Sequence, residues 1–303
     1  MLGKLLKYEF KATVRLYLPL YLVVVVFAFL GRLSISGNLL NITSTLNAYG
    51  GSFTIGGREG FLGSLVSTAA AVVLVGYFMT LLGAVVVHFI ITIQRFWKNL
   101  MGDEGYLMFT LPVSVDELLW CKAIVASVWS LITSLVLLLS LMILAFQPWM
   151  VQAVLGFFRS LGPEAAIFWE MMGLIFNRGF WMMMLLALPV STLEGLFFLY
   201  AAMAIGHTVR NHKVLASIGA YVGMSTVISI ATSVVMAVVM PLLGEDLTVV
   251  DEAVDGAELL AAMEVVGQFV NWSMVIGLVM SAAMTVAMYF VARYLLNSQL
   301  NLE

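Results

Sequence analysis

The sequence predicts an all-α, polytopic membrane protein with six transmembrane helices. Of its 303 residues, 62% are hydrophobic and only 10% are charged, whereas soluble domains are about 25% charged. The apolar residues form six long runs with few charged residues, without the alternating pattern of barrel strands. Because lipid offers the backbone no hydrogen-bond partners, runs of this kind cross a membrane as helices.

The composition also excludes several classes of protein. So few charges cannot cover the apolar surface of a water-soluble enzyme of this size. A net charge of −3, without a large basic cluster, excludes a nucleic-acid-binding protein. Cys121 is the only cysteine, which excludes an internal disulfide framework and a zinc site built on thiolates.

Six apolar stretches with few charged residues are long enough to cross about 30 Å of hydrocarbon. The predicted spans are residues 16–33, 61–93, 116–146, 182–205, 214–242 and 271–296. The first begins beside Pro19, which fits the first turn of a helix. We expect this span to remain in the mature protein, because no small-residue cleavage site follows it.

The basic residues predict the orientation of these spans. Ten of the 14 Lys and Arg residues fall on one set of faces and four on the other. The ten are Lys4, Lys7, Lys11, Arg15, Arg95, Lys98, Lys122, Arg210, Lys213 and Arg293, and the four are Arg32, Arg58, Arg159 and Arg178. The positive-inside rule places the ten in the cytoplasm. Both termini are then cytoplasmic, and segments 34–60, 147–181 and 243–270 are external.

An amphipathic helix is predicted at the N-terminus, over residues 2–15. Its apolar residues recur at three- and four-residue spacing on one face, and Lys or Arg residues recur on another. Such a helix lies in the cytoplasmic interface, either as an anchor on anionic lipid or as a brace against a partner. The anchor is favoured, because this pattern is common.

The cytoplasmic segment 94–115 mixes apolar, aromatic and charged residues, and we call it the docking segment. Gly102 and Gly105 permit a sharp turn in it. Ser114 and Glu117 form a capping box that opens the third span. The segment is either an interfacial connector or a short helix that enters a groove of a soluble protein. Docking is favoured, because a simple tether could be shorter and less hydrophobic.

The three external segments differ in composition. Residues 34–60 are rich in Gly, Ser, Thr and Asn, and residues 147–181 are apolar with three tryptophans, which predicts interfacial helices packed on the bundle. Residues 243–270 form an acidic external segment without Lys or Arg. Its acids, which favour cations over anions, are Glu245, Asp246, Asp251, Glu252, Asp255, Glu258 and Glu264.

Two features within the spans are candidates for function. Glu194 lies near the middle of the fourth span, where a carboxylate costs about 2.5–3.5 kcal/mol on insertion scales. It either lines a translocation path or pairs with a polar group to fix helix packing. Gly219 and Gly223 form a G-x-x-x-G face on the fifth span, which allows close approach of another helix within one chain or across a dimer.

The sequence has no phosphate-binding loop, no H-E-x-x-H and no G-x-S-x-G. Its three histidines do not gather with acids into a metal site. We therefore expect no enzymatic activity and no cofactor on this chain.

The start MLGKLLKYEF and the string GDEGYLMFTLPVS, with this topology, resemble the ABC-2-type permeases of bacterial exporters, particularly the small Gram-positive ones. The resemblance implies one permease domain over residues 1–303 in the cytoplasmic membrane, paired with an identical or a different second chain. It implies that residues 1–15 are the elbow helix and that the docking segment contains the coupling helix. A separate ATPase subunit would bind ATP and magnesium. The residues carried over as contacts to this ATPase are Phe96, Trp97, Leu100, Met101, Asp103, Glu104 and Tyr106.

Two other functions remain open from the sequence. One is a non-transporting sensor or scaffold that holds a soluble partner through the docking segment. The other is an intramembrane enzyme centred on Glu194, which lacks a second catalytic group.

Overall fold

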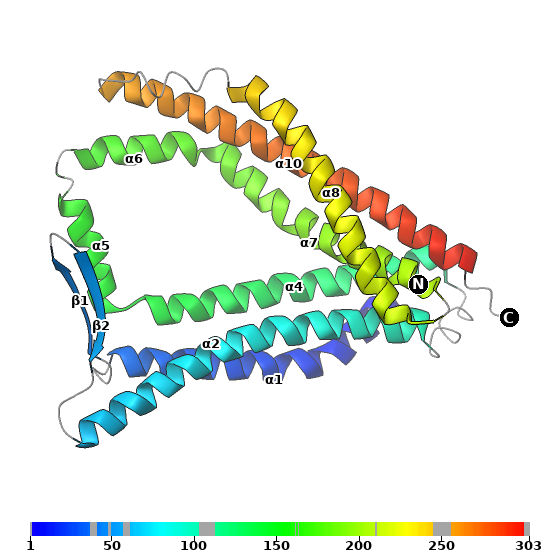
Figure 1. The fold of residues 1–303 in the computed structure, drawn as a ribbon, viewed down its shortest axis with the longest axis horizontal. Coiled ribbons are helices and arrows are strands. Elements are labelled where there is room, and N and C mark those ends of the chain that lie inside the picture. Colours follow the sequence, from blue (N-terminus) through cyan, green and yellow to red (C-terminus); the bar gives the residue numbers. More distant parts are fainter. Residues whose placement is uncertain are drawn as a thin grey trace. The chain divides into compact units, whose positions relative to one another are not determined.

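The computed structural model describes residues 2–36, 41–47, 50–56, 61–102, 113–160, 162, 164–209, 211–244 and 256–299. Six helices in this part of the chain are long and apolar enough to cross a membrane. They are α1 (Leu2–Ser36), α2 (Phe61–Phe96), α4 (Val115–Ala145), α7 (Arg178–His207), α8 (Lys213–Gly244) and α10 (Gly256–Gln299) (Figure 1). The chain is thus a multi-pass membrane protein, as predicted.

Four of these helices, α2, α4, α7 and α8, match the predicted spans to within a few residues. The α4 helix ends at Ala145, shortly before Pro148, because the residue before a proline disfavours helical geometry. Pro189 and Pro241 lie inside α7 and α8. Helices at membrane depth tolerate such prolines when neighbouring groups satisfy the freed carbonyls.

The first helix differs from the prediction. A single helix of 35 residues, α1, contains Pro19 in its interior. The placement of Pro19 in the first turn of a helix is therefore wrong, because one missing backbone hydrogen bond does not end a long apolar helix. Residues 2–15 continue directly into the span, and the separate interfacial helix predicted there is not observed.

The last helix is longer than predicted. With 44 residues, α10 is about 66 Å long at 1.5 Å per residue, which is roughly twice the hydrocarbon thickness. Its first turns, from Gly256 onward, belong to the predicted acidic segment and carry Glu258 and Glu264. The other five acids of that segment lie outside the described residues.

Three further helical elements and one hairpin complete the described chain. They are η1 (Trp97–Met101), α5 (Pro148–Ser160), α6 (Glu164–Ile175), β1 (Asn41–Asn47) and β2 (Gly50–Gly56). The strands pair antiparallel, with Asn41 opposite Gly56, in a segment for which no strand was predicted. Both strands lack the long apolar run of a span and contain Thr and Ile, and β2 also contains Gly, a composition that favours a short hairpin over a helix.

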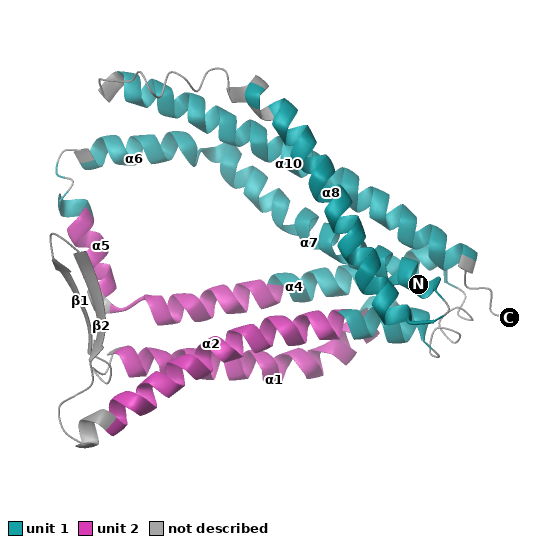
Figure 2. Ribbon diagram, in the orientation of Figure 1, with its two compact units in different colours: residues 1–6, 93–131, 158–303 teal, residues 7–92, 132–157 magenta. Residues whose placement is uncertain are grey.

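The chain divides into two compact units (Figure 2). Unit 1 comprises Met1–Leu6, Ile93–Leu131 and Phe158–Glu303, and unit 2 comprises Lys7–Thr92 and Ile132–Phe157. The boundaries therefore fall inside α1, α2, α4 and α5, and each unit is described separately below.

In unit 1, α10 packs along α6 and α7, and α7 also packs against α8 (Figure 1). Glycines stand where these helices meet most closely. A Cβ on Gly206 of α7 would lie 2.0 Å from Ser217 Oγ of α8, and one on Gly267 of α10 would lie 2.5 Å from the Leu174 carbonyl oxygen of α6. Small residues allow membrane helices to approach in this way.

In unit 2, a buried polar stripe runs along α4. Its members are Thr133 and Ser140, which are 5% and 1% exposed. Gln147, which is 1% exposed, lies two residues beyond the end of the helix. Seven residues make about two helical turns, so Thr133 and Ser140 share one face. The Tyr21 hydroxyl of α1 lies 2.7 Å from Thr133 Oγ1, and the Tyr77 hydroxyl of α2 lies 3.1 Å from Ser140 Oγ. The stripe thus faces both other long helices of the unit.

Two more polar contacts hold α1 in unit 2. The Tyr17 hydroxyl lies 3.0 Å from His88 Nδ1 of α2. Arg32 donates through Nη1 to the Ile143 carbonyl of α4 at 2.7 Å. Hydrogen bonds therefore connect the helices of unit 2 at several levels along their length.

Candidate functional site: the two ends of the docking segment

The docking segment begins in the hydrophobic core of unit 1. The Phe96 ring is fully buried and stacks on Tyr200 of α7, with the ring centroids 4.0 Å apart and the planes 9° from parallel. Leu100, 1% exposed, lies in the same cluster. The cluster also contains Leu118, Leu119, Ala123, Leu196, Phe197, Leu199, Ala201, Met203, Ala292 and Leu296. Phe96 and Leu100 therefore face the core of their own chain, and their side chains are covered.

Other side chains of this stretch remain accessible. Trp97 and Met101 are partly buried and pack against the rim of the core, whereas Lys98 is exposed. The edge of Trp97 meets the His207 ring at 5.8 Å. Of the predicted contacts to an ATPase, Trp97 and Met101 thus keep partly accessible side chains, and Gln94, Lys98 and Ser114 are the exposed side chains among the described residues of the docking segment.

A π-helical turn, η1, carries both the buried Leu100 and the accessible side chains. The Gly102 N–H donates to the Trp97 carbonyl at 2.9 Å. A Cβ at Gly102 would lie 2.9 Å from the Lys98 carbonyl oxygen, so the turn requires the glycine. Single π-turns are rare and are frequent at functional sites. The remaining predicted contacts, Asp103, Glu104 and Tyr106, lie outside the described residues.

The other end of the docking segment is the start of α4. The Glu117 N–H donates to Ser114 Oγ at 3.2 Å, and the Leu118 N–H donates to the Ser114 carbonyl. The predicted cap at Ser114 is confirmed. It fixes the point at which the chain leaves the docking segment and becomes helical.

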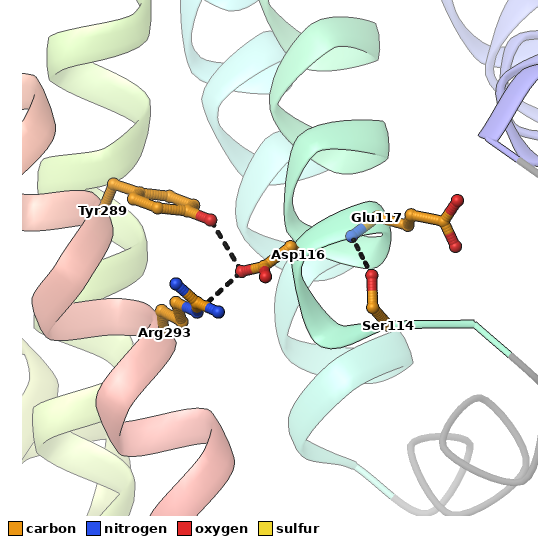
Figure 3. Close-up of polar contacts among 5 residues, drawn as sticks. All are labelled: Ser114, Asp116, Glu117, Tyr289 and Arg293. Atoms are coloured by element: carbon orange, nitrogen blue, oxygen red, sulfur yellow. Dashed lines mark hydrogen bonds and ion pairs between the residues drawn. The ribbon is translucent and has the colours of Figure 1, made fainter.

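Immediately after this cap, Asp116 joins α4 to α10 (Figure 3). Its Oδ1 accepts a hydrogen bond of 2.6 Å from the Tyr289 hydroxyl and lies 2.9 Å from Nε of Arg293. Tyr289 and Arg293 are one helical turn apart, so both point from the same face of α10 toward one oxygen. We call these three residues the Asp116 cluster.

The Asp116 cluster is only partly shielded from solvent. The side chains of Arg293 and Asp116 are 41% and 34% exposed. An exposed ion pair alone contributes roughly 0.2–1 kcal/mol, and a hydrogen bond to a charged group roughly 1.5–3 kcal/mol. The two donors together therefore hold α4 and α10 more firmly than the ion pair would by itself.

Sequence analysis did not identify this cluster, although a signal for it exists. Asp116 begins the third span, and Arg293 lies near the end of the sixth. An up-and-down topology places those two helix ends on the same side of the membrane, where an acidic and a basic residue can form an ion pair. What the sequence lacked was any indication that α4 and α10 are neighbours.

The structure supplies a partner for Glu194. The Ser281 hydroxyl of α10 donates to Glu194 Oε2 of α7. Nearby on α7, Thr192 Oγ1 lies 2.9 Å from Ser127 Oγ of α4. Polar contacts therefore connect α4, α7 and α10 within unit 1, and Glu194 is the charged member among them.

The predicted glycine face on α8 has no partner helix in the described chain. Gly219 and Gly223 are exposed, and a Cβ at either position would meet no atom within 4 Å. Packing against a second chain stays a prediction for this face.

The described residues contain no group of three or more His, Cys, Asp and Glu side chains that could hold a metal ion. Comparisons with family models, curated proteins and solved structures found no match.

Proposed function

We propose that this chain is the membrane-spanning permease subunit of an ATP-binding-cassette exporter in the bacterial cytoplasmic membrane. Its six long apolar helices and the resemblance of its two sequence strings to ABC-2-type permeases support this function. ATP and magnesium would bind to a separate ATPase subunit, and this chain would provide the docking segment and the transmembrane path.

The observation that carries the proposal is that both ends of the docking segment are fixed to unit 1. At one end, Phe96 is stacked on Tyr200 of α7. At the other, Asp116 is bound to Tyr289 and Arg293 of α10. A flexible tether would need neither attachment, whereas a segment that transmits force needs both.

These attachments define a route for the motion. When the ATPase displaces the docking segment, Phe96 carries the displacement to α7 and Asp116 carries it to α10. Packed aromatic rings transmit movement, and so does a carboxylate that is held by two donors, because neither arrangement can deform far without losing its contacts. The two helices that receive the motion also carry Glu194 and Ser281 at membrane depth.

A second permease chain, identical or different, would complete the transporter. The exposed Gly219–Gly223 face supports a contact through α8, since small residues allow two helices to approach closely. The transport path would then lie between the two chains.

The test is co-expression with a candidate soluble ATPase subunit, followed by purification and assay in proteoliposomes. Because Phe96 and Leu100 are core residues, the variant should alter only accessible or charged positions: Lys98→Glu with Asp103→Lys and Glu104→Lys. We expect loss of ATPase co-purification with normal folding. Arg159→Glu, on the predicted external side, is the matched control and should leave the complex intact.

Two outcomes would contradict the proposal. If the triple variant still co-purified with the full amount of ATPase, residues 94–115 would not be the segment that binds it. A stable complex whose ATPase activity never responds to any transported solute would favour a sensor or scaffold that uses the same segment to hold its partner.

A further inference from the structure

The Glu194–Ser281 pair lies in the middle of two membrane-spanning helices, and the carboxylate receives little compensation there. Among the described residues, Ser281 is the one hydrogen-bond partner of Glu194, and no Lys, Arg or His forms an ion pair with it. On α7, the residues with basic side chains stand at the ends, at Arg178 and His207. His207 is thirteen residues from Glu194, about 20 Å along the helix axis.

One neutral donor does not offset the cost of an intramembrane carboxylate. Charged residues at this depth pair with opposite charges or face a path for ions or substrates. Glu194 is partly exposed rather than enclosed. Its uncompensated charge can therefore be approached from outside the described helices.

The surroundings of the carboxylate are open and aromatic. Gly195 follows Glu194, and Gly277 lies one turn before Ser281; a Cβ at either glycine would meet no atom within 4 Å. One turn after Glu194, the Phe198 ring meets the Tyr221 ring of α8 edge to face, with centroids 4.9 Å apart. Tyr221 is 41% exposed. Vacant space, aromatic faces and a negative charge are the elements that bind an organic cation.

We propose that Glu194, held by Ser281 and flanked by Phe198 and Tyr221, binds the positively charged group of a lipophilic cation within the membrane. Given the exporter function proposed above, this assigns the transported substrates to lipophilic or amphipathic cations. Ser281 orients the carboxylate, and the aromatic pair contacts the apolar body of the cation. The acidic residues of segment 243–270 carry the same negative charge as Glu194.

The test uses the purified full chain in lipid nanodiscs, without an ATPase. Equilibrium dialysis measures binding of tetraphenylphosphonium and of tetraphenylborate, which have the same shape and opposite charge. Empty nanodiscs of the same lipid give the partition background. We expect saturable binding of the phosphonium above this background and no comparable site for the borate.

Variants then separate a binding role from a packing role. Glu194→Gln should weaken phosphonium binding by about tenfold or more, since it removes the opposite charge, and Glu194→Asp should retain most of it. Ser281→Ala removes the hydrogen bond but keeps the charge, so binding should persist. Glu170→Gln, which removes an exposed carboxylate on α6, outside the acidic segment, should change nothing.

The proposal is overturned if the wild-type chain takes up no phosphonium above the nanodisc background. It is also overturned if Glu194→Gln binds as well as the wild type, or if Ser281→Ala and Glu194→Gln lose binding and thermal stability in parallel. Because the assay contains no ATPase, its result does not depend on whether the docking assignment is correct.

Discussion

Tyr289 donates a 2.6 Å hydrogen bond to Asp116, a residue 173 positions earlier in the chain. The same carboxylate oxygen binds Arg293, so the first turn of α4 and the last turns of α10 share one anchoring point. That point lies two residues after the Ser114 cap, where the docking segment ends. Any movement of the segment at this end acts on α10 through Asp116.

The first prediction concerns this anchoring point. Asp116→Ala removes the acceptor of both donors and should lower the free energy of unfolding by about 1–3 kcal/mol, measured by thermal unfolding of the purified chain. Tyr289→Phe should cost less, because the ion pair remains. In a complex with the proposed ATPase subunit, we expect Asp116→Ala to reduce transport per ATP hydrolysed more than ATPase binding.

A charge exchange checks that the pair itself is responsible. Asp116→Arg with Arg293→Asp should recover part of the loss seen with either single change. If the double variant is as impaired as the sum of the single variants, the two residues act independently.

The second prediction concerns the buried start of the docking segment. Phe96→Ala removes a fully buried ring that stacks on Tyr200 and should destabilise the chain by about 3–5 kcal/mol. The exposed neighbour Lys98 is the control, since Lys98→Ala should be nearly neutral. Equal thermal stability of both variants would show that Phe96 is not a core residue.

The third prediction compares glycines with and without neighbours. Gly206→Ala would place a methyl group 2.0 Å from Ser217 Oγ, so α7 and α8 must separate and the yield of folded protein should fall sharply. Gly219→Ala and Gly223→Ala meet no atom within 4 Å and should leave the fold of a single chain unchanged. Size-exclusion profiles and thermal scans of the three variants make the comparison.

The same two glycines test the contact between chains. Replacing Gly219 and Gly223 together with leucine should weaken self-association of the chain in membranes, because close helix approach is lost. Crosslinking yield at constant expression measures the effect. An unchanged yield would exclude this face from the contact between identical chains.

The fourth prediction tests the orientation. Cys121, the only cysteine, is 2% exposed, so the wild-type chain should react little with a membrane-impermeant maleimide. In intact cells, Arg159→Cys should be labelled, whereas Lys98→Cys should be labelled only after permeabilisation. Labelling of Lys98→Cys in intact cells would show that the orientation is the opposite of the predicted one and that the docking segment is not cytoplasmic.

The fifth prediction concerns the cap of α4. Ser114→Ala should cost about 0.5–2 kcal/mol of stability, and Ser114→Asp should retain most of it, since its carboxylate can accept the same hydrogen bond from Glu117. Thermal unfolding measures both. Because the cap lies beside Asp116, the alanine variant should also weaken coupling to the ATPase.

The sequence was sufficient to predict features that depend on local chemistry. The requirement to satisfy the backbone in lipid makes long apolar runs helical, so the spans at α2, α4, α7 and α8 could be placed closely. The Ser114 cap followed from two residues three positions apart. The need for glycine at position 102 was also predictable, as a sharp turn.

Features that depend on which helices are neighbours could not be predicted. The bonds from Asp116 to Arg293 and from Glu194 to Ser281 each join α10 to another helix, and nothing in one sequence specifies that packing. The continuity of α1 was missed because Pro19 was given more weight than the surrounding apolar helix. The burial of Phe96 was missed because an aromatic residue in a loop looks the same whether it faces a partner or its own core.

The polar stripe on α4 also limits how unit 2 can change shape. Thr133 and Ser140 lie seven residues apart on one face of the helix, and their hydroxyls meet tyrosines of α1 and α2. If α4 slid by one helical turn along its axis, leucines would replace these hydroxyls and the tyrosines would lose their partners in an apolar medium. Sliding of α4 along its axis within the unit is thus disfavoured. Unit 2 should therefore move as a rigid body in any conformational change.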